Sequence, residues 1–150
     1  MASTDTPAAP WHAAFPAPKA QPGGMSKEAV LELIRSAVAG RDYVLVDLRR
    51  IDHEGGTIRG SINLPAQSLY PSIPTLYTMF KAAGVPKVLW YCGSSGGRGT
   101  RAAAWFADYI QDQQDAKMES LILQGGIKGW ARGGPQFVEQ MLGYDASYWA

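Results

Sequence analysis

The sequence predicts an α/β domain in three layers, with a central, mainly parallel sheet flanked by helices. Three short apolar runs have the composition of buried strands: Tyr43–Leu48, Lys87–Tyr91 and Leu121–Leu123. The segments between them place apolar residues at helical spacing. Because strands that alternate with helices usually pair in parallel, the pattern favours a sheet covered on both faces.

The first predicted helix begins after Ser26, a good N-cap residue, has Glu28 in its first turn and ends at Gly40. One face of this helix is apolar, formed by Val30, Leu33, Ile34, Ala37 and Val38. We expect a turn at 54–56 and a short strand over 61–64, which Pro65 stops.

A second helix is predicted from about Pro74 to Ala83, since proline is tolerated in a first turn and Gly84 provides the stop. A third follows the strand that ends at Tyr91. Its apolar face comprises Ala102, Trp105, Phe106, Tyr109 and Ile110.

Residues 1–24 differ in composition from the rest of the chain. They hold five of the ten prolines and seven alanines, so neither a regular helix nor a central strand is expected there. Composition favours a flexible leader. Trp11, His12 and Phe15 offer the alternative of an arm that docks on the domain or on a neighbouring copy. Residues 25–150 are predicted to form the catalytic domain.

Bulk properties narrow the class of protein. A chain of 150 residues has the length of one domain and can bury a core. With a formal net charge of +1, we expect neither nucleic acid nor a membrane surface as a partner. The single cysteine cannot form an internal disulfide, which favours a reducing compartment, the cytoplasm with the nucleus also open. The oligomeric state stays open.

The segment from Cys92 to Arg98 carries most of the functional signal. A strand that ends in the only cysteine turns through Gly93, Ser94, Ser95, Gly96 and Gly97 into a helix. Backbone N–H groups at such a bend, with the positive end of the helix, form a seat for an anion. We expect these donors and Arg98 to stabilise the Cys92 thiolate as a nucleophile, while the Arg98 guanidinium holds two substrate oxygens.

Four motifs in order make residues 25–134 resemble the rhodanese-fold family. They are Val46–Arg49, which is similar to the family's Asp-x-Arg strand end, Glu54–Pro65, the Cys92 loop, and Gly125–Trp130. Typical sulfurtransferases of the family have a loop one residue shorter than that of its cell-cycle dual-specificity phosphatases and eukaryotic arsenate reductases. Cys92–Arg98 has the longer, seven-residue form. The resemblance therefore implies a tetrahedral oxyanion of phosphate size as substrate.

Three positions depart from that pattern. Tyr91 stands where those enzymes usually have histidine, the loop lacks the glutamate proposed as a general acid in the phosphatases, and Leu48 occupies the place of a second, protective cysteine found in some relatives. Cleavage of an alkyl phosphate benefits from a proton donor, whereas arsenate carries its own proton. With one cysteine, reduction of a cysteine–arsenate adduct requires an external thiol, and the resemblance implies glutathione, with or without glutaredoxin.

The leading hypothesis is an arsenate reductase that uses Cys92 and Arg98, retains some aryl-phosphatase activity and has no bound cofactor. A dual-specificity or tyrosine protein phosphatase is the alternative. A thiosulfate sulfurtransferase and a non-catalytic module that binds oxyanions are further alternatives.

Several neighbouring residues have open roles. Ser94 and Ser95 either form the turn or contact substrate. Asp47 and Arg49 are interpreted as a structural ion pair below the loop, and Arg101 either widens the positive field or is solvated. A cluster at 52–54 either supplies an acid or is a solvated turn. Two other signals are weak: the Gly97–Ala102 match to a dinucleotide fingerprint lies too late in the chain, and two distant histidines predict no metal site.

Overall fold

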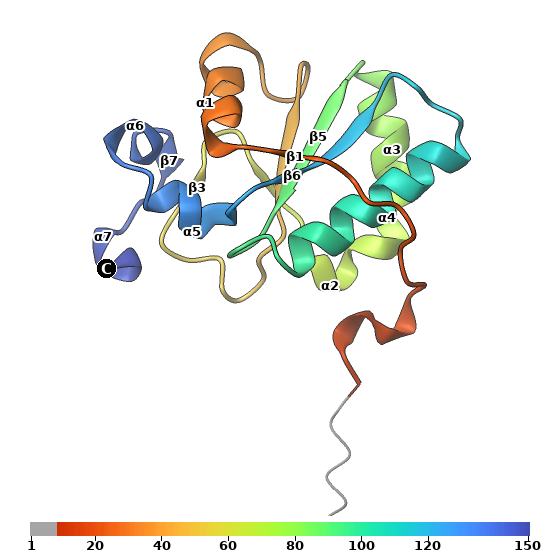
Figure 1. Ribbon diagram of the computed structural model, residues 1–150, viewed down its shortest axis with the longest axis horizontal. Coiled ribbons are helices and arrows are strands. Elements are labelled where there is room, and N and C mark those ends of the chain that lie inside the picture. The colour runs from red at the N-terminus through yellow and green to blue at the C-terminus, as the bar shows by residue number, and fades with distance from the viewer. Residues whose placement is uncertain (1–8) are drawn as a thin grey trace, which may run out of the picture.

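The computed structural model describes residues 9–150, and its centre is a five-stranded parallel sheet. The strand order is β1-β6-β5-β2-β4. These strands span Gly24–Met25 (β1), Glu119–Leu123 (β6), Lys87–Tyr91 (β5), Val44–Asp47 (β2) and Ile62–Asn63 (β4). Figure 1 shows the strands side by side behind the N-terminal segment. Every pairing in this sheet is parallel, as the sequence predicts.

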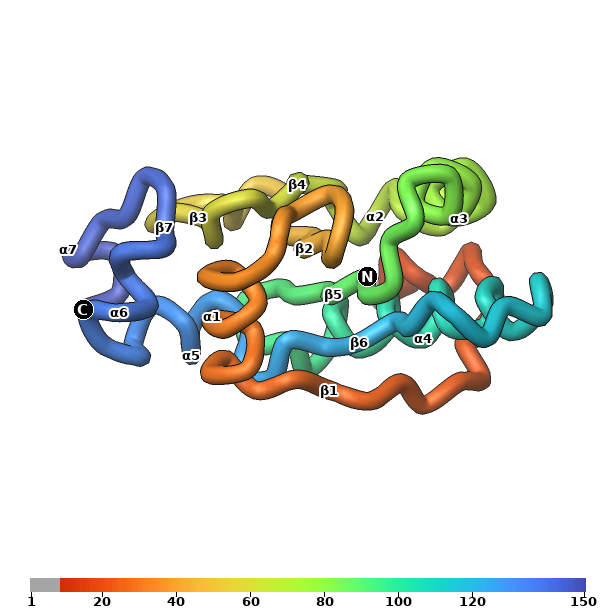
Figure 2. The backbone as a smooth tube through the Cα atoms, turned by 90° about the horizontal axis from the view of Figure 1, so that it is seen from above, coloured from red at the N-terminus to blue at the C-terminus, as the bar shows by residue number. Residues whose placement is uncertain are grey.

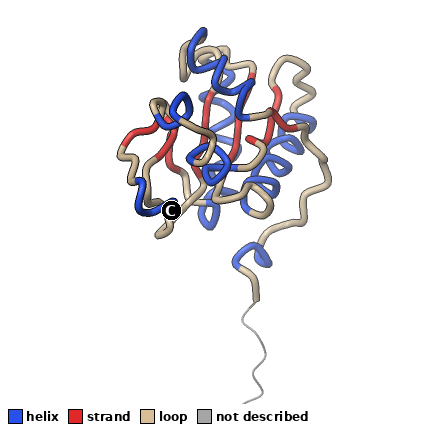
Figure 3. Tube along the Cα trace, turned by 60° about the vertical axis from the view of Figure 1, so that its left-hand side comes forward, coloured by secondary structure: helices blue, strands red, loops and turns tan. Residues whose placement is uncertain are grey.

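Helices cover both faces of the sheet, which gives the three layers expected for this fold class. One face carries α2 (Ala66–Leu69), the 3-10 turn η2 (Tyr70–Ser72), α3 (Ile73–Ala82) and α4 (Arg98–Asp112). The other carries α1 (Lys27–Ser36), α5 (Gly126–Ala131), α6 (Pro135–Val138) and α7 (Ala146–Trp149). Figure 2 shows the strands between these two groups of helices, and Figure 3 shows the same layering from the side.

Two apolar clusters fill the spaces between the sheet and its helices. Side chains alternate along β5, so Val88 and Trp90 enter the cluster under α3 and α4, whereas Leu89 and Tyr91 enter the cluster under α1 and α5. Cys92 continues the first set. The alternation therefore decides that the thiol faces α4.

The long elements follow the sequence-based expectations closely. The Ser26 hydroxyl caps α1 by accepting a hydrogen bond from the Ala29 N–H at 3.1 Å, which confirms the predicted N-cap. The helix ends at Ser36, before the predicted stop at Gly40, because the Val38 N–H donates to the Asp42 carboxylate and the chain turns there. The predicted strand at Lys87–Tyr91 is confirmed at both ends.

The short strand predicted over 61–64 is present as β4, but several other short elements were not predicted. Thr57–Ile58 (β3) and Met141–Leu142 (β7) form a separate antiparallel pair, and α2, α6 and α7 have four residues each. Such elements are too short to show a periodic pattern.

The described part of the N-terminal arm, residues 9–24, lies along the domain (Figure 1). It contains a 3-10 turn, Trp11–Ala14, and ends in the edge strand β1, which pairs with β6. The boundary expected between the arm (1–24) and the catalytic domain (25–150) thus falls inside strand β1. Residues 1–8, the start of that predicted arm, lie outside the described residues. In the part of the chain that the structure describes, no helix is both long and apolar enough to cross a bilayer.

Candidate active site

The loop from Cys92 to Arg98 connects the carboxyl end of β5 to the start of α4. Cys92 is 3% exposed, and its Sγ accepts hydrogen bonds from the Ser95 N–H at 3.2 Å and the Gly99 N–H at 3.4 Å. The two donors come from the middle of the loop and from the first turn of α4. The loop therefore folds around the sulfur as the strand–turn–helix pattern predicts.

Ser95 is a structural part of the loop. Its side chain is buried, its Oγ accepts from the Cys92 N–H at 3.4 Å, and its carbonyl accepts from the Thr100 hydroxyl at 2.7 Å. Its φ of 65° lies in the left-handed region, which a non-glycine residue adopts only when its surroundings hold it there. Of the two roles that the sequence leaves open for Ser95, the structure favours the turn-forming one, because the side chain takes part in the loop's own hydrogen bonds.

Ser94 and Gly96 form the outer part of the turn. Both are exposed, and the Ser94 Oγ accepts a hydrogen bond from the Gly96 N–H at 3.3 Å. Ser94 also lines the pocket described below, so the turn leaves its side chain within reach of a ligand.

The Arg98 guanidinium is paired with a carboxylate that comes from a different part of the chain. Its Nη1 donates to Asp52 Oδ1 at 2.9 Å and its Nη2 donates to Asp52 Oδ2 at 2.7 Å. The hydrogen bonds from Arg98 lower the pKa of Asp52 to about 2, and those to Asp52 raise the pKa of Arg98. Asp52 thus uses the two donors that the sequence assigns to a substrate oxyanion.

Asp47 and Arg49 form a buried ion pair, as interpreted from the sequence. Arg49 Nη2 lies 2.8 Å from Asp47 Oδ2, and both side chains are almost inaccessible. The remaining Arg49 donors bind the carbonyls of Glu54 and Gly56 at 2.8 Å each. Burial opposes the charge of Arg49, but its hydrogen bonds to Asp47 keep its pKa raised. The pair holds the 52–56 turn in place, and with it the backbone of Asp52.

Tyr91, the residue before the predicted nucleophile, anchors the strand end that carries Cys92. Its hydroxyl lies 2.7 Å from Ser61 Oγ and 3.0 Å from Thr57 Oγ1, and it accepts from the Ile58 N–H at 3.3 Å. Burial raises the pKa of Tyr91, so the phenol stays neutral. These hydrogen bonds of Tyr91 support the start of the loop from the face of the sheet that α1 covers.

The start of α5 packs against the first peptide groups of the loop. The Ile127 N–H donates to the Cys92 carbonyl and the Lys128 N–H donates to the Gly93 carbonyl, both at 3.0 Å. Gly126 has a φ of 59°, and a Cβ there would lie 2.6 Å from the Cys92 carbonyl oxygen and 2.5 Å from that of Gly93. Only glycine permits this approach.

A surface pocket of about 560 Å³ opens beside the sulfur. Cys92, Gly93, Ser94, Gly97 and Arg98 supply the loop wall, and Arg101, on the next turn of α4, also lines it. Three further segments contribute residues that were not predicted as site residues: Trp11 and His12 from the arm, Gln67 from α2 and Lys128 from α5. Asp52 completes the lining.

The structure thus gathers the predicted Cys92, Gly93, Ser94, Gly97, Arg98 and Arg101 around one pocket. Asp47 and Arg49 lie behind the 52–56 turn. Within residues 9–150, the Gln67 Oε1 is a buried side-chain oxygen without a hydrogen-bond partner. The signal for Lys128 was its place in the Gly125–Trp130 motif. No local pattern identified Gln67.

Comparison with known proteins gives the same picture of the fold. The family model for the rhodanese-like domain matches residues 30–132 of this chain. Arsenical-resistance protein 2 of Saccharomyces cerevisiae is 33% identical over 97 residues, which cover 60% of this chain and 75% of that protein.

Two solved structures share the fold at lower sequence identity. The As-Sb reductase of Leishmania major has a TM-score of 0.64 and 22% identity, covering 70% of this chain and 73% of that one. A yeast protein tyrosine phosphatase of the Rhodanese family has a TM-score of 0.70 and 18% identity, covering 88% and 99%.

Proposed function

This chain belongs to the rhodanese-like domain family, and within that family we propose that it is an arsenate reductase with residual phosphatase activity. The observation that carries the proposal is the seven-residue loop, in which two backbone N–H groups point at the Cys92 sulfur and Arg98 stands at the rim. The name of the yeast relative, an arsenical-resistance protein, supports arsenate as the substrate.

In the proposed first step the Cys92 thiolate attacks the arsenic atom. The S–As bond forms, one As–O bond breaks, and the departing oxygen leaves as water after it takes up a proton. The amides of the loop and the Arg98 fork bind the remaining oxygens, which requires Arg98 to exchange Asp52 for the substrate.

Gln67 gives this pocket an acceptor that suits a protonated oxyanion. Its Oε1 is buried and has no partner among the described residues, so the Gln67 side chain must turn towards the pocket before an As–OH group can donate to it. Arsenate keeps a hydroxyl when it binds as the monoanion or dianion, which favours arsenate and phosphate monoesters with a free hydroxyl.

The adduct is resolved by a thiol from outside the chain, because Cys92 is the only cysteine. Glutathione attacks the Cys92 sulfur, a disulfide forms between the two, and the two electrons that the S–As bond releases reduce As(V) to As(III). A second glutathione, delivered directly or by glutaredoxin, then frees Cys92. Arg101 and Lys128 at the pocket wall complement the carboxylates of glutathione. A need for reduced glutathione is consistent with a reducing compartment, the cytoplasm or nucleus, which we propose as the location.

A protein phosphatase is the second candidate, since phosphate and arsenate have the same shape and charge and the same thiolate and arginine would act on both. Because the loop itself holds no carboxylate, a phosphatase would need a proton donor from outside the loop, whereas arsenate carries its own proton.

The test is a coupled assay in which the whole protein receives arsenate, glutathione, glutaredoxin, glutathione reductase and NADPH. We expect arsenate-dependent NADPH oxidation in the wild type, and background rates in Cys92→Ser and in reactions without glutathione. An aryl phosphate, phosphotyrosine peptides and thiosulfate are assayed in parallel. Faster turnover of phosphopeptides than of arsenate would favour the phosphatase. Cys92-dependent release of sulfite from thiosulfate, with no arsenate reduction, would replace the proposal with sulfur transfer.

A further inference from the structure

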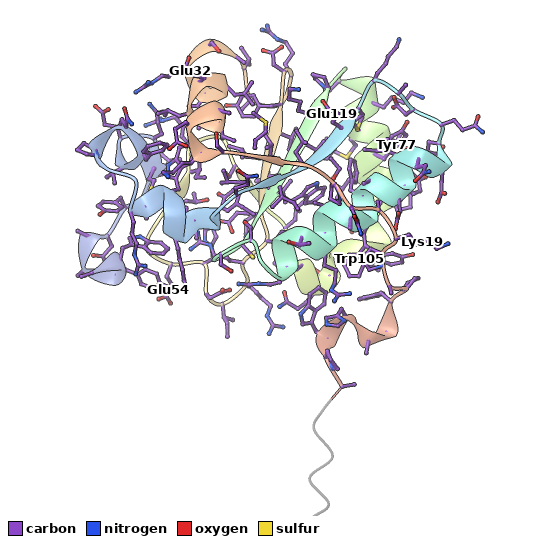
Figure 4. All side chains as sticks on the ribbon, in the orientation of Figure 1. Lys19, Glu32, Glu54, Tyr77, Trp105 and Glu119 are labelled. Carbon is purple, nitrogen blue, oxygen red and sulfur yellow. The ribbon has the colours of Figure 1, made fainter. Side chains whose placement is uncertain are left out.

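The N-terminal arm is held against α4 by hydrogen bonds at two places. The Trp105 indole N–H donates to the Pro16 carbonyl at 2.8 Å. Further along, the Asp108 carboxylate accepts from the backbone N–H groups of Lys19 and Ala20, at 2.9 and 2.8 Å. Figure 4 shows Trp105 and Lys19 where the arm passes α4. Backbone hydrogen bonds of this kind fix the path of the chain whatever its side chains are.

Aromatic contacts continue this attachment towards the pocket. Phe15 stacks on Tyr70, with ring centroids 5.2 Å apart, and meets the edge of Trp105 at 5.9 Å. Trp11 also meets Trp105 at 5.9 Å, and the imidazole of His12 lies 5.3 Å from the Trp11 ring in an edge-to-face arrangement. These aromatic contacts thus hold the 3-10 turn that contains His12 against α4.

The position that results puts His12 on the wall of the Cys92 pocket. The charged and titratable groups that share this wall come from four elements, namely Asp52, Cys92, Arg98, Arg101 and Lys128. The three basic side chains among them, Arg98, Arg101 and Lys128, attract an anion, but arginine and lysine are poor proton donors at neutral pH. Asp52 has no proton to give while it is paired, since its pKa is about 2. Histidine is the side chain that commonly exchanges protons near neutral pH.

We propose that His12 is the catalytic proton donor that replaces the carboxylate absent from the loop. In this step the S–P or S–As bond forms as the bond to the leaving oxygen breaks, and the proton of the imidazolium passes to that oxygen. The products are an alcohol or phenol from a phosphate ester and water from arsenate, with neutral imidazole left on the protein. The inference rests on the proposed function and adds the N-terminal arm to its active site.

The first experiment compares leaving groups in wild type and His12→Gln, with Ala14→Gln, an exposed change on the same turn, as the matched control. A proton donor matters most when the leaving oxygen is basic. We therefore expect kcat/KM for an alkyl phosphate to fall about 100-fold in His12→Gln and that for 4-nitrophenyl phosphate to fall less than about threefold. The fall in rate at alkaline pH should also disappear. An equal loss on both substrates, or none, would overturn the inference.

Asp52→Asn tests the competing donor in the same assay. If the selective loss on the alkyl phosphate and the loss of the alkaline limb appear in Asp52→Asn and not in His12→Gln, Asp52 is the acid and the inference is wrong.

A second measurement does not require turnover. The His12 ring signals are followed by NMR as inorganic phosphate is added to wild type and to Arg98→Ala. We expect the titration midpoint of His12 to rise when phosphate binds in the wild type and to stay unchanged in Arg98→Ala. If the wild type reduces no arsenate but phosphate still raises the titration midpoint of His12, the proposed function is refuted, whereas the inference that His12 faces a bound oxyanion stands. A His12 signal that phosphate does not move would refute the inference.

Discussion

Arg98 and Asp52 face each other across the mouth of the loop, and both guanidinium Nη atoms donate to the Asp52 carboxylate at 2.7–2.9 Å. The two residues are 46 positions apart in the chain. The carboxylate has the planar, two-oxygen geometry that an arginine fork binds best. A substrate oxyanion that uses Arg98 must displace it, so the ion pair competes with substrate binding.

The first prediction follows from this competition. Asp52→Asn should tighten the binding of inorganic phosphate or arsenate about 1.4- to fivefold, because ion pairs near the surface contribute roughly 0.2–1 kcal/mol and the bound anion no longer has to break one. Phosphate inhibition of aryl-phosphate hydrolysis measures the change. Asp42→Asn, which removes the partner of Arg41 far from the loop, is the matched control and should leave the inhibition constant unchanged. Weaker phosphate binding in Asp52→Asn would show that the carboxylate assists the anion.

The same pair makes a contribution to stability that depends on pH. The pKa of Asp52 is about 2 in the folded protein and about 3.9 in an unfolded chain, so the folded state favours the ionised form. This contribution is fully present above pH 4 and is lost as the pH falls through about 2. The free energy of unfolding, measured with urea from pH 7 to pH 2, should therefore differ between wild type and Asp52→Asn at neutral pH, and the difference should shrink below pH 4. A constant difference over that range would contradict the assignment.

Gly126 provides a test of the contact between α5 and the loop. Gly126→Ala should lower Cys92-dependent activity at least tenfold and destabilise the protein by about 1–3 kcal/mol, because the new Cβ meets the Cys92 and Gly93 carbonyl oxygens and φ is positive. Gly129→Ala, in the same helix and with open space around its Cβ position, is the control. It should leave activity intact and raise stability slightly, as alanine favours a helix over glycine. Similar effects of both changes would exclude this explanation.

The next prediction concerns the Tyr91 hydroxyl, which holds the strand end that precedes Cys92. Tyr91→Phe removes a buried hydroxyl and leaves the Ile58 N–H without its acceptor, which should cost about 1–3 kcal/mol in the free energy of unfolding. Urea denaturation measures it, with the exposed Tyr144→Phe as control. Because the loop is anchored through this strand end, kcat should fall as well. Unchanged stability would mean that the hydroxyl network does not support the loop.

Regular structure and the nucleophilic loop were accessible from sequence because both depend on neighbouring residues. The apolar run of β5, the cap at Ser26 and the glycine-rich turn after Cys92 are local patterns with a direct conformational meaning. The two-residue strands β1 and β3 carry no such pattern. They form because another segment already presents an edge to pair with, β6 for β1 and β7 for β3.

The sequence by itself determined that a thiol stands at the end of a buried strand, that an anion seat follows it and that an arginine closes the loop. Tertiary structure alone decided that Asp52 occupies the Arg98 fork, that Gly126 lets α5 approach the loop, and that the arm brings His12 to the Cys92 pocket. The physical reason is range: backbone geometry and helix dipoles act within a few residues, whereas these contacts join segments that only the packing of helices on the sheet brings together.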